Sequence, residues 1–175
     1  MATVPAPEWR ERFRAPTLTL PEWSRHAPGR AVLTSDETGS FQVYAWDIAS
    51  GERRKVTDER VGVMYATVSA DGREVVWFSD TTGDESGRWL AIPFEGGEPR
   101  EILPGAPVGW PDGLAVGLHV VAGVLAERDG FAVYVSRDGQ PAKEILRHVD
   151  MLGIGGTDFH IEGFTLGGLS SDEDL

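Results

Sequence analysis

The sequence repeats one unit three times, and such a repeat constrains the fold more than any other feature of a chain. Each unit contains apolar runs of four to eight residues separated by turns rich in Gly, Asp and Ser, with no sustained 3.6-residue periodicity. Val56, Ile102 and Ile145 mark the last short strand of each unit, at spacings of 46 and 43 residues. Because repeats of about 40 to 50 residues with four short strands are typical of β-propeller blades, the sequence predicts an all-β fold.

The second unit is the best preserved and shows how its strands begin and end. Within the stretch VSADGREVVWFSD, Asp71-Gly72 is a turn pair that allows a positive φ at little cost. The apolar run from Val75 to Phe78 follows and is predicted to be the inner strand of the unit. Turn-rich TTGDESG then leads to a second apolar run, RWLAIPF.

The chain divides into an arm and an incomplete propeller. Residues 1–29 hold five prolines, which are excluded from helix interiors and central strands, so they predict a proline-rich N-terminal arm. Blades are expected at approximately 30–60, 61–104 and 105–148, with the start of the next at 149–175. The stretch Gly168 to Asp172 resembles the approach to the strand at Val75. We therefore expect a partial β-propeller of about three four-stranded antiparallel blades plus the start of a fourth.

Three blades and a fraction cannot close the ring of four to eight that a propeller normally forms. The sequence is therefore interpreted as a segment of something longer. Unpaired strand edges and blade faces favour association with other copies, so self-association through open blade edges is expected.

Composition and charge limit the partners and the compartment. The formal charge of −12 opposes binding to nucleic acid, and the absence of cysteine excludes disulfides and thiolate metal sites. The N-terminus has no apolar signal-peptide region. The longest nearly unbroken apolar run, 114–126, falls short of the roughly 20 residues that span a bilayer. The sequence thus predicts a cytoplasmic protein without a membrane partner.

Three strings carry a family resemblance: LTSDETGSFQVYAWDIASGERRKVTD (33–58), VSADGREVVWFSDTTGDESGRWLAIPFEGG (68–97) and GGLSSDE (167–173). They resemble the N-terminal β-propeller of prolyl-oligopeptidase-family (S9) serine peptidases, acylaminoacyl-peptidase-like members in particular, and more distantly TolB-type propeller repeats. The resemblance covers nearly the whole chain from about residue 16. Its motif is more specific for propeller repeats than for the peptidase, since similar blades occur in proteins that are not enzymes.

The resemblance implies that the propeller covers the active site of a C-terminal α/β-hydrolase domain and admits short peptides. That domain is missing from this chain: no G-x-S-x-G nucleophile elbow is present, and Ser170 in GGLSS lacks the second glycine. No catalytic, cofactor-binding or metal-binding residue is therefore assigned. The implied partners are the missing hydrolase domain and the peptide substrate of the parent enzyme. The alternative is a TolB- or WD-like module for protein–protein interaction, with no enzymatic activity.

Two patterns rich in acidic residues are candidate sites. Asp158, His160 and Glu162 alternate, so a strand would place all three on one face, where they could bind a metal. Such sites usually take two histidines from separate elements, so a solvated strand face is favoured. The pairs Asp36-Glu37 and Asp84-Glu85 occupy equivalent loop tips and could meet a cation. They lack the spacing of a calcium loop and are interpreted as charged hairpin turns.

Two further patterns are interpreted structurally. The stretch Gly153-Ile154-Gly155-Gly156 fails as a dinucleotide fingerprint, because Asp158 stands at its sixth position and no helical pattern follows. Trp46, Trp77 and Trp89 could stack on a ligand. Each lies in an apolar strand run of the repeats, so packing between blades is predicted for all three.

Overall fold

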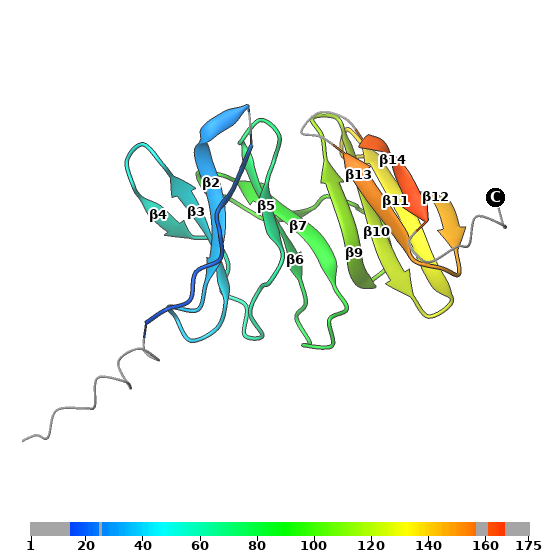
Figure 1. Cartoon of the computed structure of the whole chain (residues 1–175), viewed down its shortest axis with the longest axis horizontal. Helices are drawn as coiled ribbons and strands as arrows, with labels where there is room; N and C mark the ends of the chain where they lie inside the picture. The colour runs from blue at the N-terminus through cyan, green and yellow to red at the C-terminus, as the bar shows by residue number, and fades with distance from the viewer. Residues whose placement is uncertain (1–14, 25, 157–160, 167–175) are drawn as a thin grey trace, which may run out of the picture.

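The computed structural model describes residues 15–24, 26–156 and 161–166, and these residues form strands and turns with no helix. The strands make three four-stranded antiparallel sheets and one two-stranded sheet, arranged side by side (Figure 1). Each four-stranded sheet is built from consecutive strands, as in a propeller blade. The all-β partial propeller predicted from the repeat is confirmed. No helix among the described residues could cross a membrane.

The first blade begins earlier in the chain than the repeat suggested. Its strands, in spatial order, are β1 (Glu22–Ser24), β2 (Ala27–Ser35), β3 (Gln42–Asp47) and β4 (Arg53–Lys55). Strand β1 lies within the predicted arm 1–29. The pairing with β2 is extended by the Thr19 N–H, which donates to the Thr34 carbonyl oxygen at 3.0 Å. Pro21 is tolerated here because β1 is the edge strand of its sheet.

The other blades follow in chain order. The second contains β5 (Ala66–Val68), β6 (Glu74–Ser79), β7 (Arg88–Pro93) and β8 (Arg100–Glu101). The third contains β9 (Trp110–Val116), β10 (Val120–Glu127), β11 (Gly130–Arg137) and β12 (Lys143–His148), and the last pair is β13 (Leu152–Gly156) and β14 (Ile161–Leu166). The predicted inner strand of the second unit is β6, which lies second in its sheet beside the edge strand β5.

Apolar side chains on both faces of the middle blade hold the three blades together. Along β6, Val75 and Trp77 face the first blade, whereas Val76 and Phe78 face the third. This alternation is the period of two of a strand whose two faces are both covered. A smaller cluster around Leu152 packs β13 against the third blade. The blades are thus joined face to face by side chains.

The third repeat departs from the other two in its last strand. Val56 and Ile102 each directly follow the last strand of their blade. Each donates its N–H to a carbonyl oxygen of the third strand of that blade, β3 for Val56 and β7 for Ile102. Ile145 instead lies inside β12, at a register shift between Glu144 and Leu146, and its side chain is exposed. A bulge adds one unpaired residue to a strand, so the 43-residue spacing does not join equivalent positions.

The loops gather at two ends of the molecule, which we call end A and end B. End A carries the loops that follow β2, β6 and β10 and the links between blades, at the bottom of Figure 1. End B carries the turns that follow β5, β9 and β11, at the top. The two ends present different side chains to possible partners.

Candidate functional site

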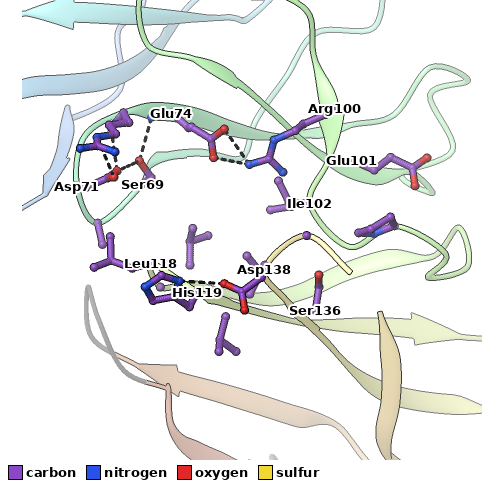
Figure 2. Close-up of a pocket in the computed structure, with 18 of the residues that line it drawn as sticks. Ser69, Asp71, Glu74, Arg100, Glu101, Ile102, Leu118, His119, Ser136 and Asp138 are labelled. Carbon is purple, nitrogen blue, oxygen red and sulfur yellow. Dashed lines mark hydrogen bonds and ion pairs between the residues drawn. The ribbon is translucent and has the colours of Figure 1, made fainter. Parts of the chain in front are cut away.

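A cleft of about 890 Å³ lies between the second and third blades at end B (Figure 2). Its walls come from the β5–β6 turn, the start of β8, the β9–β10 turn and the β11–β12 turn. Strands stacked face to face diverge toward their ends, so polar turn residues line the space that opens there. Among the described residues, this cleft brings together hydroxyl, carboxylate, guanidinium and imidazole side chains, so it is the candidate site.

The β5–β6 wall is fixed by the Asp71-Gly72 turn. The Ser69 hydroxyl donates to the Asp71 carboxylate at 2.8 Å and accepts the Glu74 N–H at 2.9 Å. Gly72 has a φ of 71°, and a Cβ at this position would collide with the Cβ of Ala27 in the first blade. Glycine is therefore required both for the backbone conformation and for the close approach of the two blades.

The charged groups of the cleft are largely paired with one another. Arg100 Nη2 donates to both carboxylate oxygens of Glu74, at 2.8 and 2.6 Å, across the space between β8 and β6 (Figure 2). On the opposite wall, His119 Nδ1 lies 2.9 Å from Asp138 Oδ1, and both side chains are exposed. A ligand would have to compete with these pairs, so the cleft suits a polar ligand better than an apolar one.

The cleft contains a serine, a histidine and an aspartate, but the described residues do not connect them as a catalytic triad. Ser136 is buried, and its hydroxyl donates to the Gln140 carbonyl oxygen at 2.7 Å, which closes the β11–β12 turn. No hydrogen bond joins Ser136 to His119 in this part of the chain. A nucleophile needs a base within hydrogen-bond reach, and here the serine has a structural partner instead.

Sequence reasoning did not single out the His119–Asp138 pair, although the hairpin contains the signal for it. Strands β10 and β11 pair in register from Glu127–Gly130 to Val120–Arg137. Counting outward equally from the Arg128-Asp129 turn brings residues 119 and 138 opposite each other. A histidine and an aspartate at matched distances from a hairpin turn could thus have been predicted as neighbours.

The predicted acidic loop tips lie at end A, and each is held by hydrogen bonds to residues of its own blade or its own loop. Asp36 accepts the Thr17 N–H at 2.6 Å, which fixes the segment before β1 to the first blade. Asp84 accepts the Thr82 hydroxyl at 2.7 Å and the Ser86 N–H at 3.2 Å. These bonds order the loops, as the interpretation as hairpin turns expects. Among the described residues, no hydrogen bond or ion pair joins the two loop tips into one site.

The remaining candidates lie largely outside the described residues. Asp158 and His160 are not described, and Glu162 lies in β14, whose side chains are not described. The stretch Gly153 to Gly156 forms most of β13, paired with β14, and is not a phosphate-binding turn before a helix. Within the described ranges, no group of three or more His, Cys, Asp or Glu residues could hold a metal ion.

The three tryptophans divide into two kinds. Trp77 and Trp89 are buried between blades, as predicted, and the Trp89 ring meets Phe78 edge to face at 5.2 Å. Trp46 is only half-buried. It pairs in register with Ala31 on the opposite face to Val32, which packs against the second blade. Trp46 therefore faces away from the second blade, where the described residues supply no further sheet.

Consecutive four-stranded sheets stacked face to face define this chain as a β-propeller segment. No protein-family model and no curated protein sequence matches the chain. Solved structures with the same fold include TolB from Acinetobacter baumannii, with a TM-score of 0.53, 18% identity, and coverage of 73% of this chain and 32% of TolB. A puromycin hydrolase variant has a TM-score of 0.57 at 20% identity, with coverage of 77% of this chain and 21% of the hydrolase. A prolyl endopeptidase has a TM-score of 0.58 at 11% identity, with coverage of 83% of this chain and 25% of the endopeptidase.

These similarities concern the fold, because the sequence identities are low. The chain spans about a third or less of each of these solved structures. Both kinds of neighbour expected from the repeat strings, peptidases and TolB, are found among them. A fold shared by a peptidase and TolB does not choose between their functions, so function must be argued separately.

Proposed function

We propose that this chain is the N-terminal propeller segment of an S9-type serine peptidase, and that it gates access of peptides to a hydrolase domain absent from this chain. The observation that supports the proposal is that the structural likeness covers 77% and 83% of this chain but only 21% and 25% of two hydrolytic enzymes. In such an arrangement the segment contributes no catalytic, cofactor-binding or metal-binding residue. It acts by excluding substrates that are too large to pass.

The stacked blades suit such a steric role. A gate must keep its shape when a peptide presses against it, and buried side chains join each blade to the next. Interiors packed in this way resist deformation. The blades therefore serve as a rigid wall, and the loops at their ends determine what passes.

The purified 175-residue chain tests the proposal directly. We expect no hydrolysis of peptide or acyl-peptide p-nitroanilides, since no serine nucleophile with a base is proposed here. Turnover that remains with the chain through further purification would overturn it. The reading frame after the Leu175 codon gives an independent test, because the proposal requires a G-x-S-x-G string within a few hundred codons. A stop codon or an unrelated domain there would also count against it.

The second candidate is a TolB- or WD-like module that binds a protein partner and has no hydrolase. The likeness to TolB over 73% of this chain favours it. The same reading frame distinguishes the two candidates. The absence of any hydrolase sequence, in the gene or its neighbours, would favour the binding module.

We further propose that the isolated chain associates with itself through the open face of the first blade. Trp23, Ala31 and Trp46 are neighbours in register on this face, and Trp23 is exposed. An apolar face of this kind favours contact with a second sheet. Sedimentation velocity should show concentration-dependent association that the double substitution Trp23→Ser and Trp46→Ser reduces. A strictly monomeric wild-type chain would refute it.

A further inference from the structure

A groove of about 610 Å³ opens at end A between the second and third blades, on the opposite end from the cleft of Figure 2. Its apolar lining includes Met64, Tyr65 and Trp110, which are 63%, 58% and 42% exposed. Phe78, which is buried, lies at the base. Large aromatic and thioether side chains exposed together are unusual on a soluble surface and indicate a place where something binds.

The backbone holds the aromatic walls in place. Val63 is buried between the first two blades, and its N–H donates to the Phe41 carbonyl oxygen at 2.7 Å, so residues next to it are directed outward. The Tyr65 carbonyl oxygen accepts the Phe78 N–H at 3.0 Å. Both sides of Tyr65 are thus anchored while its ring stays exposed. The wall is preformed and needs little reorganisation to accept a ligand.

Trp110 is attached to the second blade although it begins the third. Its indole N–H donates to the Asp84 carbonyl oxygen at 3.1 Å. Close by, the Gly87 N–H donates to the Gly109 carbonyl oxygen at 3.0 Å, which bridges the β6–β7 loop to the start of β9. These bonds fix the indole ring beside the acidic loop 80–85.

The polar part of the groove is acidic. Its lining, taken from the described residues, contains the carboxylates of Asp80 and Glu85 and no lysine or arginine. Burial opposes ionisation of Asp80, but the backbone N–H groups of Gly83, Glu85 and Thr82 donate to its carboxylate and lower its pKa overall. Asp80 is therefore ionised at neutral pH, and its negative charge is fixed at the groove.

Glu85 is held in a conformation that glycine normally adopts. Its φ is 64°, in the left-handed region, which is unfavourable for a residue with a side chain. The Glu85 N–H donates to Asp80 Oδ2 at 2.7 Å, which stabilises this backbone. No hydrogen bond or ion pair is present at the Glu85 carboxylate within the described part of the chain. The Glu85 side chain is exposed at the groove, so its carboxylate is available to a cationic group of a ligand.

We propose that this groove binds a peptide segment in which an arginine or lysine is flanked by apolar residues. The aromatic faces of Tyr65 and Trp110 attract a cation, and the Glu85 carboxylate neutralises it. The apolar flanks of the peptide cover Met64 and the base of the groove. Because the inference rests on the groove alone, it holds for a peptidase segment and for a binding module alike.

Fluorescence anisotropy with a labelled, end-blocked Gly-Leu-Arg-Leu-Gly peptide tests the proposal on the full 175-residue chain. Two further peptides carry glutamate or norleucine in place of the arginine. We expect the arginine peptide to bind best and its affinity to fall with salt, because exposed charges are screened. Equal binding of the norleucine peptide would overturn the cation-binding role, and no binding of any peptide would overturn the site.

Substitutions then locate the contacts. Trp110→Ala should weaken binding about threefold, from the usual strength of an exposed cation–π contact. Glu85→Gln should weaken it about threefold, as for an exposed ion pair. Asp58→Asn removes the same charge from an exposed residue outside the groove and should change binding less than about twofold. Should Trp110→Ala disturb folding, Tyr65→Ala replaces it. Equal effects of Glu85→Gln and Asp58→Asn would refute a specific contact.

The N-terminal arm offers a competing occupant, because its sequence EWRERFR contains three arginines with a tryptophan and a phenylalanine beside them. Replacing Arg10, Arg12 and Arg14 by serine in the full chain distinguishes the two occupants. Unchanged binding of the arginine peptide supports a separate partner. Binding that appears only after this replacement would show that the arm fills the groove, and would overturn the proposal.

Discussion

Replacing Arg147 by methionine tests whether half-buried charge pairing holds the outer part of the third blade. Arg147 lies on β12, and its guanidinium contacts three carboxylates: Glu144 at 2.7 Å, Asp129 at 3.0 Å and Glu127 at 3.2 Å. It also donates to the hydroxyl of Tyr134 at 3.2 Å, and that hydroxyl donates to Glu127 at 2.7 Å. Tyr134 belongs to the core between the second and third blades.

The expected loss of stability lies between the values for exposed and buried ion pairs. An exposed pair contributes about 0–1 kcal/mol, and breaking a buried one costs about 3–5 kcal/mol. The side chains of Arg147 and Glu127 are 32% and 19% exposed, so this network is intermediate. We expect Arg147→Met to lower the free energy of unfolding by about 2 kcal/mol. With a urea m-value of about 2 kcal/mol per M, the midpoint should fall by about 1 M.

Urea unfolding followed by tryptophan fluorescence measures this change. The control is Lys55→Met, which breaks an exposed pair with Asp58 and should cost less than about 0.5 kcal/mol. Adding Glu127→Gln to Arg147→Met should recover about 1 kcal/mol, because a poorly solvated unpaired charge is removed. If Arg147→Met cost no more than the control, the pairing argument would be wrong.

The pH dependence gives the same network a second test. The hydrogen bond from Arg147 lowers the pKa of Glu144 below its ordinary value of 4.5, although burial opposes this. Since the folded-state pKa is the lower one, the stabilisation is fully present above about pH 4.5 and is lost as the pH falls through the folded-state pKa. The difference between wild type and Arg147→Met should therefore narrow below pH 4.5. A constant difference would indicate that lost packing, and not charge, caused the effect.

Two further substitutions test how the blades pack. In Gly87→Ala the new Cβ would overlap the Ser79 carbonyl oxygen and lie 2.9 Å from the Phe78 ring, so this variant should unfold at a clearly lower urea concentration. The control Gly29→Ala has open space at its Cβ and should leave the stability close to that of the wild type. Leu125→Ala leaves a cavity at a fully buried site between the second and third blades and should lower the free energy of unfolding by about 2–5 kcal/mol. Its control Leu20→Ala changes a side chain that is 89% exposed and should lower it by less than about 0.5 kcal/mol. Thermal melts would contradict either prediction if the variant matched its control.

Strands with strong apolar runs can be predicted from the sequence. Edge strands are harder to predict. Strands β6 and β7 read directly from VVWFS and RWLAIP. Strand β1 follows Pro21, and β9 contains Pro111 and Gly113, so neither shows a regular alternation. Their place is decided by pairing with the next strand in their sheet. Such tertiary pairing overrides weak local propensity, which is why the first blade begins inside the predicted arm.

The local sequence also decides for which aromatic residues the surroundings can be predicted. Trp77 and Trp89 lie in apolar runs, and burial follows from that context. Trp110 lies in the stretch VGWPDG, between a glycine and a proline, where no strand pattern identifies its surroundings. Its role in the end A groove depends on contact with the β6–β7 loop, 26 residues earlier in the chain. An aromatic residue set among turn residues is the sequence signal that could have identified it.

The strand order also limits how a ring containing these blades could close. Each of the three sheets is complete and takes its four strands from one consecutive stretch, the first from residues 22–55. The first blade therefore already has, within the described residues, the four strands that a propeller blade usually contains. A further blade could join by packing against the face that holds Trp23 and Trp46, as the second blade packs against Val32. Closure by packing needs no exchange of hydrogen bonds, so a ring built in this way can separate at this face at a lower cost than one closed by strand pairing.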